Sequence, residues 1–308
     1  MRIFAASDLH FEFHNDIEWL PPLPADNQFD VLVLAGDIGT SAYLGAALRR
    51  LRYKYPDKPI ILVVGNHEHY GKNINRDVMA RIDVPNVHFL ENGRVDLQGY
   101  HFLGTTLWTG FDCLGEKNTK KAMKMAWKHI ADFISIRTAE LSETNGVHRF
   151  ITAEQMAALY HRARAWLIEE LQTVDPAKTI VVTHFPPARE YRHGQIAEDL
   201  ISAYFQANCR DVIEQYQPAL WIYGHNHFSD DRICGKTRVV SNQYGYPNES
   251  TGYRGDWVIT VGEAGLKPDS ELKIPSLQDM LAACNPNAPM SPESEAWING
   301  APVGEEKI

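Results

Sequence analysis

The fold is decided by residues 29–40, FDVLVLAGDIGT, in which an apolar run stops abruptly at Gly36-Asp37. The run is rich in Val and Leu without alternation, which is typical of a strand buried on both faces. Four further runs have this form: residues 3–6 before Ser7-Asp8, 60–64 before Gly65-Asn66-His67, 179–182 before Thr183-His184, and 219–223 before Gly224-His225. In open α/β sheets ligands bind at the carboxyl ends of the strands, so these polar side chains are expected to lie close together.

Helical patterns lie between the apolar runs. Residues 41–54 carry apolar side chains at helical spacing before Pro56, and residues 199–216 are expected to form another helix before Pro218. Thr152 and Gln155 form a capping box that predicts a helix of about twenty residues. Residues 86–103 and 230–260 hold short runs with turn residues, which indicate hairpins and hence mixed sheets. The pattern as a whole predicts an α/β fold in which helices cover the sheets.

The chain is expected to form one domain over residues 1–262, with a helical insert at about 112–175. Lysines recur along residues 117–137, which are predicted to be helical. Residues 263–308 are rich in Pro, Ser and Glu and are expected to form an irregular strap or tail. No apolar run reaches the eighteen residues that suggest a membrane span, and the N-terminus turns polar too soon for a secretory signal.

Composition narrows the class of protein further. Of 308 residues, 44% are hydrophobic and 22% are charged, which is ordinary for a globular protein. Lys plus Arg minus Asp plus Glu is 30 − 39 = −9, so a nucleic acid is not expected as a partner. The four cysteines are far apart without a C-x-x-C pair, which argues against a disulfide scaffold or a zinc ribbon and favours the reduced cytoplasm.

The thirteen histidines gather in clusters with Asp, Asn or Glu. The clusters are Asp8-Leu9-His10, Asn66-His67-Glu68-His69 and His225-Asn226-His227. The motif G-N-H-E, found at residues 65–68, is expected only about 0.003 times by chance in this composition. Mixed nitrogen and oxygen ligands suit Mn, Fe or Zn, and a carboxylate can bridge two cations about 3.5–4 Å apart. The clusters therefore predict a site for divalent metals.

The ordered series Asp8-x-His10, Gly36-Asp37, Gly65-Asn66-His67-Glu68, Thr183-His184 and Gly224-His225-Asn226-His227 resembles the calcineurin-like metallophosphoesterase superfamily over residues 1 to about 260. The resemblance implies a two-sheet αββα sandwich with two metals at the strand ends. It implies that the first metal is held by Asp8, His10, Asp37 and His227. It implies that the second is held by Asp37, Asn66, His184 and His225, with Asp37 as the bridge.

The resemblance also implies a reaction, in which a hydroxide that bridges two divalent ions attacks the phosphorus of a phosphate ester. Manganese is the expected metal, with iron or zinc as alternatives. His67, which is not a ligand, is the expected catalytic residue that donates a proton to the leaving oxygen. Two departures from the family pattern bear on the pocket. Thr40 stands where many members have an acid that orients this histidine, and Phe185 stands where many have a second histidine.

The substrate is the least determined feature of the sequence. We expect a small phosphorylated substrate, with a phosphodiester or a nucleotide-like molecule favoured, and its candidate contacts are His69, Arg189, Arg192 and His193. The alternatives are a phosphomonoesterase, a protein Ser/Thr phosphatase, a nuclease and an inactive metal-binding scaffold. The absence of arginines from residues 36–40 and 65–69 counts against the protein phosphatase. The sequence leaves the oligomeric state open.

Overall fold

Two sheets form the centre of the computed structural model, which describes residues 1–262 apart from 15, 17, 75–82, 139–148 and 189–198. Within the described residues, the first sheet has the strand order β11-β1-β2-β3-β4 and the second has the order β5-β6-β7-β8-β10-β9. The first sheet consists of β1 (Arg2–Ala6), β2 (Val31–Ala35), β3 (Ile60–Val63), β4 (Val87–Phe89) and β11 (Val258–Thr260). The second consists of β5 (Gly93–Leu97), β6 (Tyr100–Thr105), β7 (Thr179–Thr183), β8 (Leu220–Tyr223), β9 (Asp230–Cys234) and β10 (Thr237–Ser241).

Each sheet is mixed, as the sequence predicts. Strands β1 to β4 run parallel and β11 pairs antiparallel with β1. In the second sheet β6, β7, β8 and β10 are parallel, while the hairpins β5–β6 and β9–β10 add an antiparallel strand at each edge. The five apolar runs of the sequence are β1, β2, β3, β7 and β8, so their carboxyl ends reach the same end of the sandwich.

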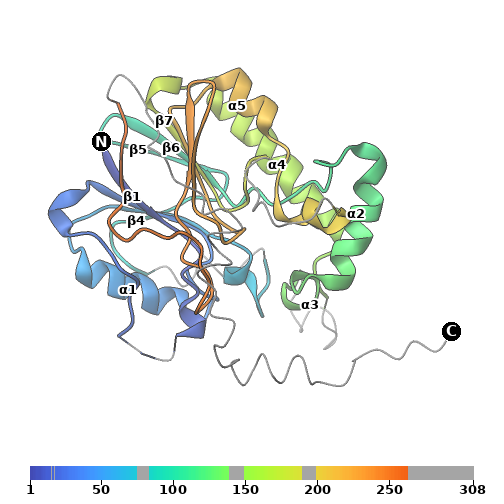
Figure 1. The fold of residues 1–308 in the computed structure, drawn as a ribbon, viewed down its shortest axis with the longest axis horizontal. Coiled ribbons are helices and arrows are strands. Elements are labelled where there is room, and N and C mark those ends of the chain that lie inside the picture. The colour runs from blue at the N-terminus through green and yellow to red at the C-terminus, as the bar shows by residue number, and fades with distance from the viewer. Residues whose placement is uncertain (15, 17, 75–82, 139–148, 189–198, 263–308) are drawn as a thin grey trace, which may run out of the picture. The chain divides into compact units, whose positions relative to one another are not determined.

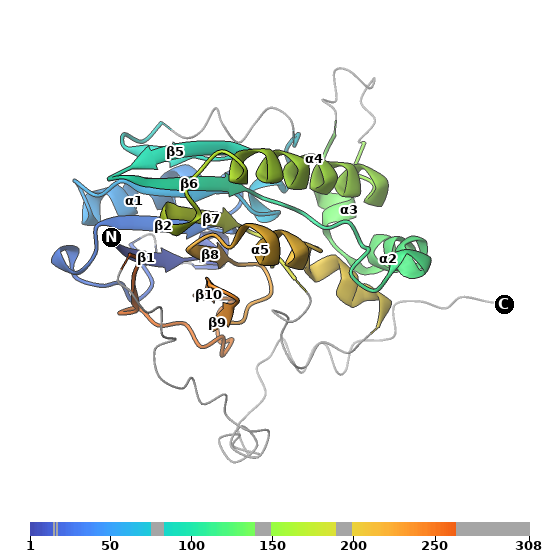
Figure 2. The ribbon, with the colours of Figure 1, turned by 90° about the horizontal axis from the view of Figure 1, so that it is seen from above.

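Helices cover the outer faces of the two sheets (Figures 1 and 2). Helix α1 (Leu44–Lys54) packs on the first sheet, and α4 (Ala153–Leu171) and α5 (Arg210–Tyr216) lie over the second. The predicted capping box is present, because Thr152 accepts a hydrogen bond from the Gln155 amide. Short 3-10 turns are η1 (Phe11–Phe13), η2 (Asp26–Gln28), η3 (His67–His69), η6 (Pro176–Lys178) and η8 (Leu200–Phe205). The αββα sandwich is therefore confirmed.

Alternate residues of the central strands point to opposite faces of the sheet, toward the other sheet or toward the helices. In β2, Val31 and Val33 face Ile180 and Val182 of the other sheet, whereas Leu32 packs in the cluster beneath α1. Because both faces of these strands are covered, all five β2 residues are buried, which explains the continuous apolar run at 31–35. Burial on both faces holds the strand ends, and thus the loops that follow them, in fixed positions.

The prediction of a helix over residues 199–216 is wrong for the first half of that segment. Residues 200–205 form the 3-10 turn η8, residues 206–209 are irregular, and the α-helix begins only at Arg210. The amides of Ala207 and Cys209 donate to the carbonyls of Pro186 and Pro187 instead of to a preceding helical turn. Backbone amides that would donate within a continuous helix therefore donate to the loop after β7.

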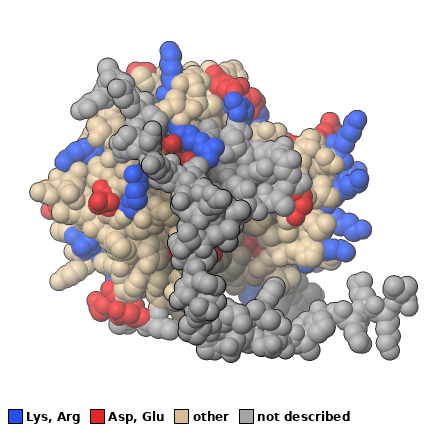
Figure 3. Space-filling view, viewed as in Figure 1, with Lys and Arg blue, Asp and Glu red and all other residues tan. Residues whose placement is uncertain are grey.

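The insert contains α2 (Glu116–His129) and the single turn α3 (Asp132–Ser135), so the helical segment expected at 117–137 is broken near Ile130. The exposed face of α2 is basic, as Figure 3 shows at the right-hand side of the molecule. Its exposed lysines are Lys117, Lys120, Lys121, Lys124 and Lys128.

Among the described residues, none of the helices combines the length and the hydropathy that a membrane span requires.

The chain divides by contacts into two units, Met1–Pro268 and Asp269–Ile308. The first unit carries all the elements named above. The expected C-terminal strap, residues 263–308, lies outside the described residues.

Candidate metal centre

The backbone is strained where the strands of the sandwich end. Asp8 and Asp37 follow β1 and β2 and have φ angles of 54° and 52°, and His225 follows β8 with a φ of 79°. Such left-handed conformations are uncommon for residues other than glycine and cluster at functional sites. Glycine is required at 65, because a Cβ there would overlap the Asp37 carboxylate and the His184 ring. The main chain thus brings these side chains into unusually close contact.

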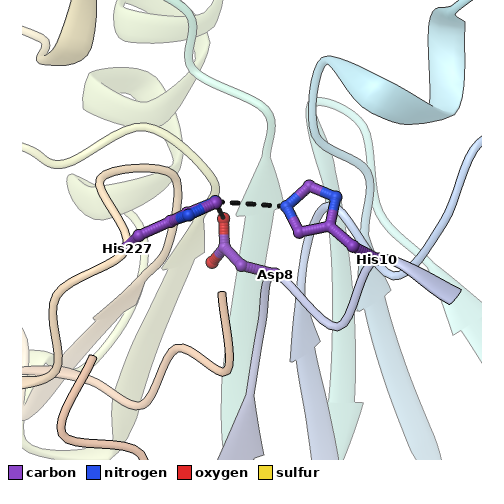
Figure 4. Close-up of side chains that lie close together, drawn as sticks. All are labelled: Asp8, His10 and His227. Carbon is purple, nitrogen blue, oxygen red and sulfur yellow. Dashed lines mark hydrogen bonds and ion pairs between the residues drawn. The ribbon is translucent and has the colours of Figure 1, made fainter. Parts of the chain in front are cut away.

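The first cluster consists of Asp8, His10 and His227 (Figure 4). Nε2 of His10 lies 3.1 Å from Nε2 of His227, and the latter atom lies 3.6 Å from Oδ1 of Asp8. Nδ1 of His10 faces Glu12 at 3.2 Å and Nδ1 of His227 faces Glu249 at 2.5 Å. Carboxylates only accept hydrogen bonds, so both Nδ1 atoms carry the proton and two Nε2 lone pairs face each other. A cation between them would satisfy both.

The spacing of this cluster agrees with metal binding. Two imidazole nitrogens that bind one cation at about 2.1 Å, in tetrahedral or octahedral geometry, lie about 3.0–3.4 Å apart. The observed separation of the two Nε2 atoms, 3.1 Å, falls within that range. Carboxylates that hold the outer nitrogen of a metal-binding histidine are a common feature of metal sites.

The second cluster consists of Asp37, His184 and His225, with Asn66 beside them. Nδ1 of His184 faces the Ala35 carbonyl at 2.9 Å and must donate to it, which leaves the Nε2 lone pair facing inward. That lone pair lies 3.4 Å from Oδ2 of Asp37 and 3.2 Å from Oδ1 of Asn66. Nε2 of His225 is buried and has no hydrogen-bond partner among the described residues. These inward acceptors fit a divalent cation.

Asp37 lies between the two clusters. Its Oδ2 is 3.9 Å from Nε2 of His10 in the first cluster and 3.4 Å from Nε2 of His184 in the second. Burial would raise the pKa of Asp37, but the imidazoles of His184 and His67 hold it well below its usual range. An ionised carboxylate in this position can bridge two cations.

The pKa values of the two buried histidines of the second cluster shift in opposite directions. Burial, followed by the nearby His184, holds the pKa of His225 well below its usual value, which keeps the His225 imidazole neutral. Burial would also lower the pKa of His184, but Asp37 raises it to about 9. A position that attracts a proton so strongly in the absence of other cations also attracts a metal ion, which would displace that proton.

His67 lies beside the two clusters and forms a third group of neighbouring ligand atoms with His10 and Glu12. Its Nε2 lies 4.0 Å from Oδ2 of Asp37 and 3.4 Å from the Tyr246 hydroxyl. Its Nδ1 faces Oε1 of Glu12 at 2.9 Å, and its ring stacks on Tyr70 with centroids 4.3 Å apart. Burial would lower the pKa of His67, but Asp37 and the hydrogen bond to Glu12 raise it to about 9. Since Glu12 holds Nδ1, the ring presents Nε2, and any proton on it, to the space beside Asp37 and Tyr246.

Glu12 is a functional candidate that the sequence analysis missed. Its Oε1 faces both His10 and His67, while its Oε2 accepts a hydrogen bond from the Thr40 amide at 3.1 Å. Burial would raise the pKa of Glu12, but the hydrogen bonds from the two histidines lower it to about 2. Glu12 therefore occupies the place of the acid that is absent at position 40. Its spacing, two residues after His10, was the available signal.

Glu68, the last residue of the G-N-H-E motif, holds the loops together. It is fully buried and accepts hydrogen bonds from the amides of Asp37, Ile38, Gly39 and Gly65. The loops after β2 and β3 are thus joined through one carboxyl group. Its role is structural, and it leaves the Asp37 side chain directed at the clusters.

The expected substrate contacts have different outcomes. His69 is buried, its ring lies 5.7 Å from that of Trp108, and burial lowers its pKa to about 4. Arg189, Arg192 and His193 lie outside the described residues. Phe185 is buried and stacks on His225 with centroids 3.9 Å apart, so the residue after His184 forms an apolar wall.

Two partly exposed rings, Phe13 and Tyr246, stand beside the first cluster and are termed the aromatic rim. Phe13 is 49% exposed and Tyr246 is 36% exposed, with ring centroids 5.1 Å apart. The Tyr246 ring lies 4.5 Å from both His10 and His227. Exposed aromatic surface next to buried polar acceptors is suited to contact a substrate group with an apolar face.

Three comparisons place the chain among known proteins. A family model described as calcineurin-like phosphoesterase matches residues 1–229. An uncharacterised protein of Acanthamoeba polyphaga mimivirus is 24% identical over 281 residues, which is 82% of this chain and 94% of that protein. The phosphopantetheinyl hydrolase of Mycobacterium tuberculosis is 21% identical, with a TM-score of 0.60 over 80% of this chain and 89% of that chain. That structure shares the fold described above.

Proposed function

The chain belongs to the calcineurin-like phosphoesterase family and is a metal-dependent phosphoester hydrolase, and we propose that its substrate is a small phosphodiester or a nucleotide-like molecule. The observation that carries the metal-dependent chemistry is the position of Asp37 between two clusters of inward-facing acceptors. Manganese is the proposed metal, with iron or zinc as alternatives, because the donors are imidazole and oxygen. The proposed compartment is the cytoplasm, since the cysteine spacing is unlike that of secreted disulfide scaffolds.

The proposed ligands divide between the two clusters. Asp8, His10 and His227 would hold one divalent ion, Asn66, His184 and His225 would hold the other, and Asp37 would contact both. When bound, the two ions supply positive charge to the phosphoryl oxygens and lower the pKa of a water toward neutrality. The protein contributes the fixed positions of these donors, which the strained loops and the carboxylates Glu12 and Glu249 maintain.

His67 is the proposed general acid of the reaction. Its Nδ1 is held by Glu12, so the ring presents Nε2 to the space beside Asp37 and Tyr246. A proton at Nε2 can be transferred to the oxygen of the leaving alcohol as the ester bond breaks. The Tyr246 hydroxyl lies within reach of the same nitrogen and can fix its orientation.

The preference for a diester rests on the charges and rings around His67. Glu12 and Glu249 are two carboxylates close to the rim, and both pKa values are lowered by histidine partners although burial opposes this. A monoester dianion would meet this negative charge with two charges of its own, whereas a diester carries one. The second ester group of a diester would lie against the aromatic rim, where a ring can pack on Phe13.

The first experiment compares 4-nitrophenyl phosphate with bis(4-nitrophenyl) phosphate, with added Mn²⁺ and with chelator. We expect metal-dependent turnover of both and a higher kcat/KM for the diester. Phe13→Ala is expected to raise the KM for the aryl diester roughly fivefold, the equivalent of about 1 kcal/mol of ring packing. The matched control is Tyr53→Ala, which removes a ring that is 91% exposed on α1 and should leave the KM unchanged.

A higher kcat/KM for the monoester would reject the diester proposal and leave the family assignment intact. An equal effect of the two alanine variants would show that the rim does not contact the substrate. A phosphopantetheinyl diester belongs in the same panel, because the solved relative with this fold is named for that hydrolysis.

A prediction follows for Glu12, which holds both His10 and His67. Glu12→Gln is expected to lower kcat roughly 10- to 100-fold, because the amide cannot accept from both Nδ1–H groups and from the Thr40 amide as a carboxylate does. The measurement is steady-state kinetics at saturating Mn²⁺. Glu249→Gln is the matched control, since Glu249 touches His227 but not His67, and it should affect metal affinity more than kcat. A kcat at the wild-type level in Glu12→Gln would contradict the role.

A further inference from the structure

A buried carboxylate in the helical insert, Asp132, contacts the candidate metal centre from outside the sequence motifs. It is the first residue of α3 and is fully buried. Its Oδ1 accepts hydrogen bonds from Nδ2 of Asn66 at 2.9 Å and from the Tyr70 hydroxyl at 2.8 Å, and its Oδ2 accepts one from the Tyr204 hydroxyl at 2.5 Å. An acid in this position needs an explanation, because a buried carboxylate is costly unless its oxygens are satisfied.

Toward a carboxylate, which only accepts, the groups around Asp132 can only donate. The Tyr70 hydroxyl donates to Oδ1 of Asp132 and the Tyr204 hydroxyl donates to Oδ2. The amide nitrogen of Asn66 can only donate. Asp132 therefore fixes which end of the Asn66 amide faces which way, with the nitrogen toward α3 and the carbonyl oxygen toward Nε2 of His184.

We propose that Asp132 is a positioning residue that orients the carbonyl oxygen of Asn66 toward the second metal, so that the helical insert sets the affinity of that position. The inference rests on the proposed metal centre. If the Asn66 amide turned over, its NH2 group would face His184 and Asp37, where a donor repels a cation. Tyr204 extends the connection to η8, since its ring lies 5.4 Å from that of His225.

The alternative explanation for Asp132 is that it only stabilises the packing of α3. The two explanations differ in what happens to metal binding when Asn66 is already absent. If Asp132 acts through Asn66, its removal adds nothing to the loss that Asn66→Ala causes. If it acts through general packing, the two losses add, as they do for independent sites.

The test measures Mn²⁺ binding to the full chain by isothermal titration, together with the bound metal per chain. The variants are Asp132→Ala, Asp132→Leu, Asp132→Asn, Asn66→Ala and the double variant Asp132→Ala with Asn66→Ala. Asp132→Ala is expected to weaken the second Mn²⁺ roughly 10- to 100-fold while the first keeps its affinity. Asp132→Asn should restore most of the loss, because its amide oxygen can still accept from Asn66 while Tyr204 accepts from its nitrogen.

Two controls separate positioning from folding. Asp132→Leu fills the space without an acceptor, so the test remains available if the alanine variant does not fold. Tyr204→Phe removes one donor to Asp132 but leaves its bond to Asn66, and it should change the second affinity less than the alanine variant does.

The outcomes distinguish the two proposals. Wild-type protein that binds no second Mn²⁺ would overturn the dinuclear centre itself. A loss in Asn66→Ala without a loss in Asp132→Ala and Asp132→Leu would overturn only the role of Asp132. Additive losses in the double variant would also overturn it, since they would mean that Asp132 does not act through Asn66.

Discussion

Asp37→Asn is expected to lower kcat/KM by more than roughly 10³-fold, the upper range for loss of a single electrostatic group in an active site. The Asp37 carboxylate approaches an imidazole of each cluster, at 3.9 Å from Nε2 of His10 and 3.4 Å from Nε2 of His184. An asparagine has the same size, but its amide offers one oxygen and directs a donor NH2 group at a position where a cation must lie. The expected result is therefore a loss of bound metal as well as of turnover.

The measurement combines kinetics on bis(4-nitrophenyl) phosphate with the metal content of the purified variant. Asp30→Asn is the matched control, because this acid lies just before β2 and pairs with Arg2, away from the metal centre. A variant of Asp37 that keeps two metals and loses less than tenfold in kcat/KM would refute its role as the bridge.

The fold, and which side chains lie together at the site, could be predicted from the sequence because both depend on the strands. Val31 to Ala35 is apolar at every position since the strand is covered on both faces, and such a strand can only lie in the middle of a layered fold. Parallel neighbours end at the same edge of a sheet, which brings Asp8 and Asp37 together in the first sheet and His184 and His225 together in the second. The packing of one sheet on the other then joins the two pairs.

Glu249 and Asp132 could not be assigned from the sequence, because each is defined by a hydrogen bond to a residue far along the chain. Asp132 contacts Asn66 and Tyr204 across separations of 66 and 72 residues. No spacing rule relates a buried acid in a helical insert to an amide side chain at the end of a strand. Glu12 differs, since its place two residues after His10 left a local signal, and the missing acid at Thr40 showed that a replacement was needed.

The error in the helix at 199–216 has the same origin. Hydrophobic periodicity indicates which face of a segment is apolar, but it does not predict which carbonyl oxygen accepts a hydrogen bond from each backbone amide. The amides of Ala207 and Cys209 bond to the loop after His184, and the segment turns there to bring Tyr204 beside His225. The segment therefore departs from a regular helix where it contacts the second cluster of the metal centre.

His67→Gln is expected to lower kcat by roughly 10²- to 10⁴-fold for an ester with a poor leaving group, which is the range for a general acid. Glutamine can still bond to Glu12, so the backbone of η3 and the neighbouring Asp37 should be undisturbed, but it has no proton to transfer. Because His67 is a ligand at neither of the two proposed metal positions, bound metal should stay at the wild-type level, although its ring nitrogen lies close to His10 and Glu12. Activity and metal content would thus separate in this variant, whereas they fall together in Asp37→Asn.

The leaving group gives the sharper test of this role. A 4-nitrophenolate ion is stable without a proton, whereas an alkoxide is not, so the loss in His67→Gln should be small for nitrophenyl esters and large for alkyl esters. The measurement is kcat for wild type and variant across diesters whose leaving alcohols span a range of pKa. A loss that is the same for all leaving groups would mean that His67 acts on the phosphoryl oxygens instead, because that contribution does not depend on the alcohol that departs.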